Sequence, residues 1–272
     1  MYNSLAKIYL FAIALLPATG GYAHAGEQVA PLNIKAAYEF NFAAFRLGKM
    51  GIEVAQTPQN YSIAADIVST GLANIIVRHS SHTTAEGSGK NYRYSRIEYE
   101  THYQTKKKKK YAHLIYKDGK LAEENVLPPD NRATRPAVAS ELKNKSYDYL
   151  TLILKLREAL YSPASKEFSF DVYDGRRLTR ITASVIGKTT ITYNNAEQPV
   201  IRVDLRRKLI AGFTKSELDD HDPDEGGVQA YFTDDDRRIP IRLEAQLMLG
   251  TLSATLVKEC SKETSCLLGI KE

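Results

Sequence analysis

Residues 231–256 read YFTDDDRRIPIRLEAQLMLGTLSATL, and this stretch decides the fold class. Apolar side chains at Ile239, Ile241 and Leu243 alternate with polar or charged ones, and residues 250–259 continue as a second run. A period of two is typical of a strand with one buried and one wet face, as in antiparallel sheets. The stretch therefore predicts two antiparallel strands that follow a polar turn.

We interpret the three acids Asp234–Asp236 as the tip of a hairpin. Asp is favoured in turns because its carboxylate accepts hydrogen bonds from nearby backbone N–H groups. Pro240 cannot donate to a strand ladder, so it marks an edge or a position whose N–H would point outward. A calcium site and a catalytic carboxylate cluster are the alternatives, but a consecutive run of acids does not by itself make ligands converge.

Similar strand patterns fill the rest of the chain. Asp-Gly pairs at 118–119 and 174–175 each predict a tight turn between two antiparallel strands. In the N-terminal part we expect strands at 34–45, 52–56 and 61–70, a turn at 46–51, a short helix capping an open sheet edge at 71–79, and a polar loop at 80–91.

One main helix is expected in SYDYLTLILKLREALY, residues 146–161. Ser146 is a suitable N-cap, and Leu150, Ile153 and Leu154 fall on one side. A helix with one apolar face must bury it, and in a chain of strands a concave sheet face is available. We therefore predict a mainly β fold: a large curved antiparallel sheet forming an open or incomplete β-barrel, with one main α-helix packed in or across its hollow.

The N-terminal segment has the pattern of a secretory signal peptide. A lysine precedes an uncharged apolar stretch at residues 8–18, and residues 23–25, Ala-His-Ala, form a small-x-small cleavage pattern. The apolar stretch is short for a spanning helix, and an uncleaved anchor or a buried helix is the alternative. We expect a signal peptide at 1–25 that is cleaved near Ala25, a periplasmic location, and one β domain at 26–272.

Charge and cysteine content narrow the function classes. The chain has 37 Lys and Arg against 32 Asp and Glu, a mild excess that permits contact with anionic envelope components but does not indicate a nucleic-acid partner. The two cysteines, Cys260 and Cys266, are a close pair in a chain expected to be exported, so they predict a disulfide. A redox-active pair is the alternative.

The strongest charged feature is a lysine run with tyrosines on both sides: Lys106, Lys107, Lys108, Lys109 and Lys110, with Tyr103 and Tyr111. Lysines often guard a solvated edge strand against pairing with another chain. They also suit contact with anionic lipid headgroups or phosphorylated sugars, and aromatic rings beside charges suit an interface. We take these seven residues as the candidate contact with a ligand or with the envelope.

Two features suggest a metal site, but each lacks ligands that such a site requires. Residues 218–227 begin like an EF-hand loop, yet its required Gly and Glu positions hold Glu225 and Tyr231. Four histidines lack a third ligand at diagnostic spacing, so we interpret them as surface or loop residues: His79, His82, His102 and His113. The sequence has no GxSxG, HExxH, P-loop or GxGxxG motif. We expect no metal, no cofactor and no catalytic residue.

Several of these patterns also carry a family resemblance. They are the acidic turn followed by IPIRLEA and LGTLSATL, the stretches YEFNFAAFRLGKMGIEV and GLANIIVRHSSHTTAEG, and the helix YDYLTLILKLREAL before FSFDVYDGRRLTRI. Together they resemble the bacterial family known as domain of unknown function 3108 (DUF3108), which implies an exported envelope protein and supplies no catalytic residues. More distantly, the ending is similar to that of periplasmic lipoprotein carriers, half-open barrels with a helical lid over an apolar cavity.

These observations leave two function hypotheses. The first is a non-enzymatic periplasmic protein that binds an apolar ligand, a lipid or a lipidated partner in its curved sheet. The second is a structural or interaction protein whose hollow is filled by its own helix, and whose lysine run contacts envelope lipid, polysaccharide or protein. A membrane-spanning segment is not expected in either case. An envelope hydrolase would need converging acid, base and nucleophile, which the sequence does not show.

Overall fold

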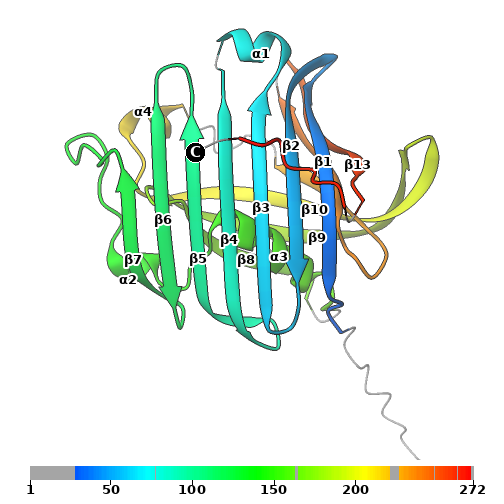
Figure 1. Cartoon of the computed structure of the whole chain (residues 1–272), viewed down its shortest axis with the longest axis horizontal. Coiled ribbons are helices and arrows are strands. Elements are labelled where there is room, and N and C mark those ends of the chain that lie inside the picture. Colours follow the sequence, from blue (N-terminus) through cyan, green and yellow to red (C-terminus); the bar gives the residue numbers. More distant parts are fainter. Residues whose placement is uncertain are drawn as a thin grey trace, which may run out of the picture.

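The computed structural model describes residues 28–76, 78–162, 165–220, 227–247, 249–261 and 263–270. The predicted signal peptide, residues 1–25, lies outside them. In the described part of the chain, thirteen strands form one antiparallel sheet in the order β7-β6-β5-β4-β3-β2-β1-β13-β12-β11-β10-β9-β8 (Figure 1). The edge strands β7 and β8 do not pair with each other, so the barrel is open and the predicted fold class is confirmed.

The strands are β1 Leu32–Phe42, β2 Phe45–Gln56, β3 Asn60–Ser69, β4 Ser80–Lys90, β5 Arg93–Gln104, β6 Lys109–Lys117, β7 Lys120–Leu127, β8 Glu167–Tyr173, β9 Leu178–Tyr193, β10 Ala196–Ala211, β11 Val228–Thr233, β12 Pro240–Leu247 and β13 Gly250–Glu259. The helices are α1 Gly71–Ile76, α2 Ser140–Lys143, α3 Tyr149–Ala159 and α4 Lys215–Asp219. None of the described helices is long and apolar enough to cross a membrane.

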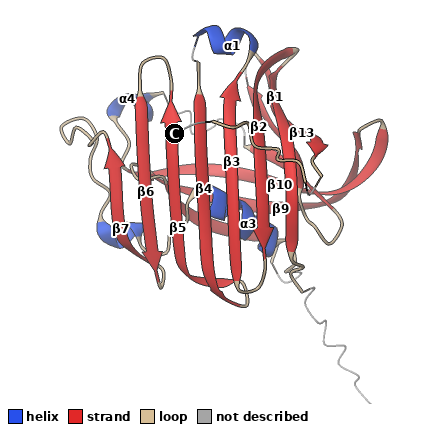
Figure 2. Ribbon diagram, viewed as in Figure 1, coloured by secondary structure: helices blue, strands red, loops and turns tan. Residues whose placement is uncertain are grey.

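The sheet folds around α3. Figures 1 and 2 show β1 to β7 as one broad wall, with β8, β9 and β10 crossing behind it and α3 in between. Leu150 and Leu154 of α3 pack into the core on the β1–β6 side, whereas Leu152 and Leu156 pack against the core of β8 to β11. The helix is therefore apolar on opposite sides, because it is covered by sheet on both.

Helix α3 begins two residues later than the sequence suggested. Asp148, and not Ser146, is the N-cap, because its Oδ1 accepts hydrogen bonds from the backbone N–H groups of Leu150 and Thr151 at 2.9 and 2.8 Å. Ser146 bonds elsewhere: its hydroxyl lies 3.0 Å from the Tyr116 hydroxyl of β6. Both side chains are buried, so the start of α3 is pinned to the sheet.

The turn expected at residues 46–51 is wrong. Strand β2 runs through this segment, and the chain reverses earlier, at Ala43 and Ala44, where Ala43 has φ 49°. The glycines that suggested a turn serve close approach instead. A Cβ atom at Gly48 would lie 2.6 Å from the carbonyl oxygen of Val68 in β3.

The polar loop expected at residues 80–91 is also wrong, because residues 80–90 form β4 inside the sheet. Small and polar residues suit this strand, since a Cβ atom at Gly87 would lie 2.0 Å from the Tyr61 ring. Helix α1 exists as predicted, but it joins β3 to β4 and packs on β2 at one end of the sheet, so it caps no edge. The lysine run does not lie on an edge strand either, because β6 is flanked by β5 and β7.

The turn chemistry at the other predicted hairpins is confirmed. Asp118 and Gly119 join β6 to β7 with φ values of 51° and 72°. In the acidic run between β11 and β12, the Asp235 Oδ1 accepts from the backbone N–H groups of Arg237 and Arg238 at 3.0 and 3.3 Å. The acids therefore form the tip of a hairpin through local side-chain bonds.

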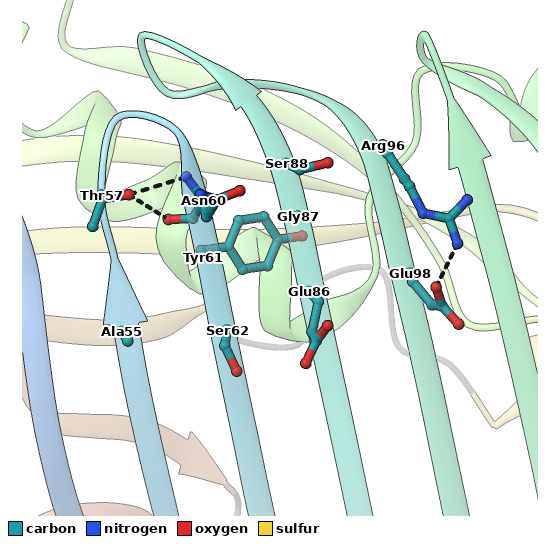
Figure 3. A pocket seen from close by; sticks show the side chains of 10 residues that line it. All are labelled: Ala55, Thr57, Asn60, Tyr61, Ser62, Glu86, Gly87, Ser88, Arg96 and Glu98. Atoms are coloured by element: carbon teal, nitrogen blue, oxygen red, sulfur yellow. Dashed lines mark hydrogen bonds and ion pairs between the residues drawn. The ribbon is translucent and has the colours of Figure 1, made fainter.

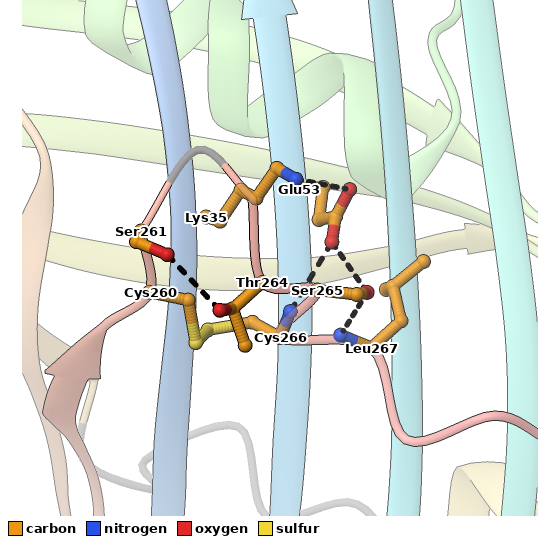
Figure 4. Close-up of a disulfide and its surroundings, with 8 residues drawn as sticks. All are labelled: Lys35, Glu53, Cys260, Ser261, Thr264, Ser265, Cys266 and Leu267. Atoms are coloured by element: carbon orange, nitrogen blue, oxygen red, sulfur yellow. Dashed lines mark hydrogen bonds and ion pairs between the residues drawn. A yellow bond between two sulfur atoms is a disulfide. The ribbon is translucent and has the colours of Figure 1, made fainter.

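The described residues after β13, residues 260–261 and 263–270, form a strap that crosses the outer face of β1, β2 and β3 (Figure 4). The Cys260 and Cys266 sulfur atoms lie 1.98 Å apart, a bonding distance that supports the predicted disulfide. Glu53 of β2 accepts a hydrogen bond from the Ser265 hydroxyl at 2.6 Å, and Asp66 of β3 accepts one from the Leu268 N–H at 2.7 Å. The strap is thus held by strand side chains as well as by the disulfide.

Candidate functional site

An apolar cavity of about 200 Å³ lies between α3 and the strands β1, β2 and β10 to β13. Its walls include Ile34 and Ile52 from the first half of the sheet, Phe232 from the second half, and Leu154 from the helix. Inward-facing residues of β1 and β2 alternate with residues on the outer face, so the strand pattern itself builds one wall. The cavity is the hollow that remains where the sheet wraps around the helix.

One end of the cavity is closed by a buried arginine. The Arg157 side chain of α3 is only 2% exposed. Its guanidinium donates to the carbonyl oxygens of Arg237 at 2.7 Å and Ala30 at 2.6 Å, and to the Gln56 side-chain oxygen at 2.9 Å. These bonds join the segment before β1, the end of β2 and the β11–β12 turn to the helix.

Burial sets the protonation behaviour of the polar groups near this end. It lowers the pKa of Arg157, although the guanidinium keeps several acceptors that favour its charged form. It also raises the pKa of Glu158, whose carboxylate bonds to Lys155 at 2.7 Å and to the Gln56 amide at 2.8 Å. Burial raises the pKa of Tyr38 as well, so its hydroxyl stays protonated and donates to the Pro240 carbonyl at 2.7 Å.

The other end of the cavity is more open. The ladder places Phe40 of β1 beside Ala254 of β13, and Ala254 beside Leu243 of β12. These three side chains line the cavity but are only partly buried, as is Met50 of β2. The opening therefore faces the end of the sheet that carries α1, where β1 and β12 finish.

The lining limits what the cavity can do. Among the described residues that line it, the side chains with polar groups are Tyr38, Arg157 and Arg238, and the rest are hydrocarbon or thioether. Tyr38 and Arg157 are already hydrogen-bonded, and Arg238 forms an ion pair with Asp234 at 2.6 Å. Such a lining suits a hydrocarbon group, since a polar ligand would lose its bonds to water without replacement.

A second hollow lies on the outer face of β2 to β5 and is wide and polar (Figure 3). Figure 3 shows Glu86, Ser62 and Arg96 on neighbouring strands around it, with Arg96 bonded to Glu98 at 2.6 Å. The hollow exists because Ala55 and the serines have small side chains. It is open to solvent and its charges are partly paired, so it offers less to a ligand than the apolar cavity beside α3.

Comparison with known proteins places the chain in a family. Residues 37–257 match the family model described as protein of unknown function (DUF3108). The chain belongs to the DUF3108 family. The crystal structure of a beta-barrel-like protein of domain of unknown function DUF1849 from Brucella abortus is similar, with TM-score 0.54 and 12% identity over 87% of this chain and 100% of that chain. This likeness concerns the fold alone. Among curated proteins, none matches.

Three of the four predicted histidines of this DUF3108 protein lie in strands, and each bonds to a different acid. His82 pairs with Asp66 at 2.6 Å, His102 with Glu100 at 2.8 Å, and His113 with Glu98 at 3.0 Å. The fourth histidine, His79, has its ring nitrogen 3.3 Å from the Ser81 hydroxyl. In the described residues, no group of three or more potential metal ligands converges. Residues 221–226 of the EF-hand-like stretch lie outside the described part of the chain.

The structure divides the predicted contact residues between two places. Lys106, Lys107 and Lys108 form the exposed β5–β6 turn of this DUF3108 protein, whereas Lys109 and Lys110 begin β6. The alternation of side chains along β5 and β6 places the remaining contact residues on opposite faces of the sheet. Lys110 and Tyr103 are cross-strand neighbours, with the Lys110 Nζ 5.7 Å from the Tyr103 ring centre, whereas Tyr111 contacts the His102 ring on the opposite face.

Sequence analysis missed the buried Arg157, which closes the cavity. A signal was present, because Arg157 lies three residues after Leu154 and therefore on a buried side of the helix. Charged residues are rarely fully buried without partners, so such a position indicates a bonding network. Its acceptors are carbonyl oxygens at residues 30 and 237, and nothing in the sequence links those positions to the helix.

Proposed function

We propose that this DUF3108 protein is a non-enzymatic protein of the periplasm that binds an apolar ligand, such as a lipid acyl chain or the lipid of a modified partner, in the cavity beside α3. The observation that carries the proposal is the cavity itself, which is lined mostly by hydrocarbon, closed at one end by Arg157 and more open at the other. Well-packed interiors leave few voids of this size, so a retained apolar cavity favours an occupant.

The cavity volume of about 200 Å³ favours part of a chain over a whole lipid. Apolar cavities of about 150 Å³ already hold a benzene-sized group and stay free of water. An acyl chain would enter past Phe40 and Leu243 and extend toward Arg157, with its polar head left at the opening. The Arg157 guanidinium would then set how deep the chain reaches.

Export and the absence of catalysis are part of the same proposal. A disulfide persists in oxidising compartments, and the bonded pair Cys260–Cys266 supports such a location together with the N-terminal signal pattern. A binding role is favoured over an enzymatic one because the described cavity lining offers tyrosine and arginine groups that are already bonded, and these are poor nucleophiles and bases.

Native mass spectrometry of the mature protein from a gentle periplasmic extract tests the proposal. We expect an added mass that organic extraction removes. Ala254→Leu, which fills the open end, should lose this mass, whereas Ala55→Leu on the exposed outer face of β2 should keep it. A bare mass in the unaltered protein, together with no uptake of added oleate, would rule out the ligand.

One observation favours the alternative, a structural or interaction protein without a ligand. Helix α3 already fills much of the hollow, since Leu154 is 1% exposed and the Thr151 hydroxyl lies 2.6 Å from the buried Tyr61 hydroxyl. In that case the remaining cavity is a packing defect. Ala254→Leu would then raise the free energy of unfolding, because it fills empty space without displacing anything.

A further inference from the structure

The most exposed apolar side chains of the described residues gather at one end of the sheet. Phe45, Ile75, Ile76 and Leu249 are 62%, 66%, 76% and 83% exposed, more than any other large apolar side chain described. In an antiparallel sheet alternate connections lie at the same end, so the β1–β2, β3–β4 and β12–β13 connections lie at one end of the sheet. Phe45 directly follows the first of them as the first residue of β2, and the other three residues lie in the second and third. We call this end, with the β5–β6 turn, the α1-end rim.

Backbone contacts join the parts of the α1-end rim. The Ala43 N–H in the β1–β2 turn donates to the Thr251 carbonyl of β13 at 2.9 Å, beside Leu249. The Thr70 N–H, directly before α1, donates to the Leu47 carbonyl of β2 at 2.8 Å. The Lys106 ammonium then donates to the carbonyl of Ile75 in α1. The exposed apolar residues and the lysine turn are therefore one continuous surface.

The rim is also basic. Its four segments, residues 43–49, 70–79, 104–110 and 247–251, contain no Asp or Glu but hold Lys49, Arg78 and the lysine run. They also hold Arg46, which pairs with Glu39 of β1 at 2.8 Å. Turns at the opposite end do carry acids, among them Asp118 and the run 234–236. The β10–β11 connection reaches the same end of the sheet by this alternation and carries the acids of α4, of which Glu217 pairs with Arg135 at 2.9 Å.

We propose that the α1-end rim docks on the surface of an anionic lipid bilayer. Apolar side chains beside lysines are the combination that binds the interface between headgroups and acyl chains. The apolar side chains enter this interface, and the lysines contact the lipid phosphates. Scattered apolar residues on a surface need no explanation, but four highly exposed ones beside a run of lysines do. The cavity opens toward the same end.

Docking goes beyond the ligand proposal and does not depend on it. Flotation with vesicles measures it directly, with equal parts phosphatidylglycerol and phosphatidylcholine against phosphatidylcholine alone. We expect binding to the anionic vesicles that weakens with salt. Lys107→Ser with Lys108→Ser should reduce affinity by about 20-fold to 30-fold, since each lysine near such a surface contributes about fivefold. The matched pair Lys90→Ser with Lys120→Ser, at the opposite end, should change it little.

A second set of variants tests the contribution of the apolar rim residues to vesicle binding. Ile75→Ser with Ile76→Ser should lower affinity at least about tenfold, because two side chains can no longer leave water. Ile186→Ser, a 45% exposed residue of β9, is the matched control. Equal losses for rim and control variants would overturn the proposal, and so would equal binding to neutral and anionic vesicles.

A fluorescent probe places the contact. The chain has no Trp, so Phe45→Trp gives a single reporter on the rim and Val257→Trp one on β13 away from it. We expect the Phe45→Trp emission to shift to shorter wavelength with anionic vesicles and the Val257→Trp emission to stay unchanged. Unchanged emission from both would overturn docking through the rim. Ala254→Leu should still dock, so failure of the cavity proposal and failure of docking give different results.

Discussion

Gly51 of β2 lies directly beneath the backbone carbonyl of Cys266, so that a Cβ atom at residue 51 would be 2.0 Å from that oxygen. The strap after β13 therefore rests on the strand backbone, where only glycine leaves room. Asp66, itself 1% exposed, accepts from the strap N–H groups of Leu268 and Gly269 at 2.7 and 3.0 Å. The strap is consequently a packed part of the outer face of the sheet.

Replacing Gly51 by valine should displace the strap. The added side chain cannot coexist with the Cys266 carbonyl at 2.0 Å, and overpacking of this kind costs roughly 1–3 kcal/mol. Urea unfolding measures the loss, and hydrogen exchange at Leu268 locates it. Lys49→Val, at an exposed position of the same strand, is the control and should change stability little. Protected Leu268 exchange in Gly51→Val would contradict this account of the glycine.

The disulfide should contribute about 2 kcal/mol to the free energy of unfolding, because it closes a short loop and removes little chain entropy. Cys260→Ser with Cys266→Ser tests this by urea unfolding under oxidising conditions. The far-ultraviolet circular dichroism should stay that of a β protein, since Glu53 and Asp66 still hold the strap. Complete unfolding of the double variant would show that the disulfide does more than secure the strap.

The strands that the sequence predicted are those whose side chains alternate or whose turns carry Asp-Gly. The failures have a common physical cause. Strand β4 is rich in Ser, Thr and Gly, which suggest a loop, yet Gly87 is required by the Tyr61 ring and Thr83 bonds Thr101 across the strands at 2.8 Å. Gly48 is likewise required by a neighbouring strand, because a Cβ atom there would meet the Val68 carbonyl of β3. Contacts between strands decided these positions, and local sequence does not contain them.

The candidate site was predictable in kind but not in detail. One amphipathic helix in a chain of one-sided strands indicates a helix in a curved sheet, and that is where α3 lies. The cavity depends on side-chain volumes from six strands and on Arg157, whose acceptors are backbone carbonyls far along the chain. The rim residues Ile75 and Leu249 gave no signal either, because a single apolar residue in a connection looks the same whether it is exposed or covered.

Arg157→Met should destabilise the fold by at least about 3 kcal/mol, because it leaves two backbone carbonyls and the buried Gln56 side chain without this donor. Methionine keeps much of the side-chain volume, so the loss reports on hydrogen bonds more than on packing. Thermal and urea unfolding measure it. Arg132→Met, at a 63% exposed side chain, should be close to neutral. Similar small losses in both variants would refute a structural role for the arginine network.

The N-cap of α3 should respond to pH in a defined direction. Burial raises the pKa of Asp148, although its bonds to Thr151 and Leu150 oppose the rise. An acid whose pKa is raised on folding loses stability as pH rises above the ordinary value. The free energy of unfolding of Asp148→Asn should therefore rise relative to that of the unaltered protein as pH increases. Asp148→Ala should instead lower the free energy of unfolding by about 1–2 kcal/mol at every pH. Urea unfolding between roughly pH 4 and 8 distinguishes the behaviour of the two variants.

Glu217 should give the opposite dependence. Burial alone would raise its pKa, but the Arg135 guanidinium, the Thr214 N–H and Arg177 outweigh burial and lower the pKa to about 2. Because the folded value lies below the ordinary 4.5, the carboxylate stabilises the fold above that pH, and the contribution disappears as pH falls toward 2. Glu217→Gln should be less stable than the unaltered protein at neutral pH by about 1 kcal/mol.

That difference should shrink between pH 4.5 and 2, where the unaltered protein also loses the charge of Glu217. Glu123→Gln is the matched control, because its 60% exposed side chain makes a solvent-screened ion pair with Lys117 at 3.3 Å and should matter little. Urea midpoints at four or so pH values across this range suffice. A constant difference between Glu217→Gln and the unaltered protein down to pH 2 would mean that Arg135 does not hold Glu217 in its charged form.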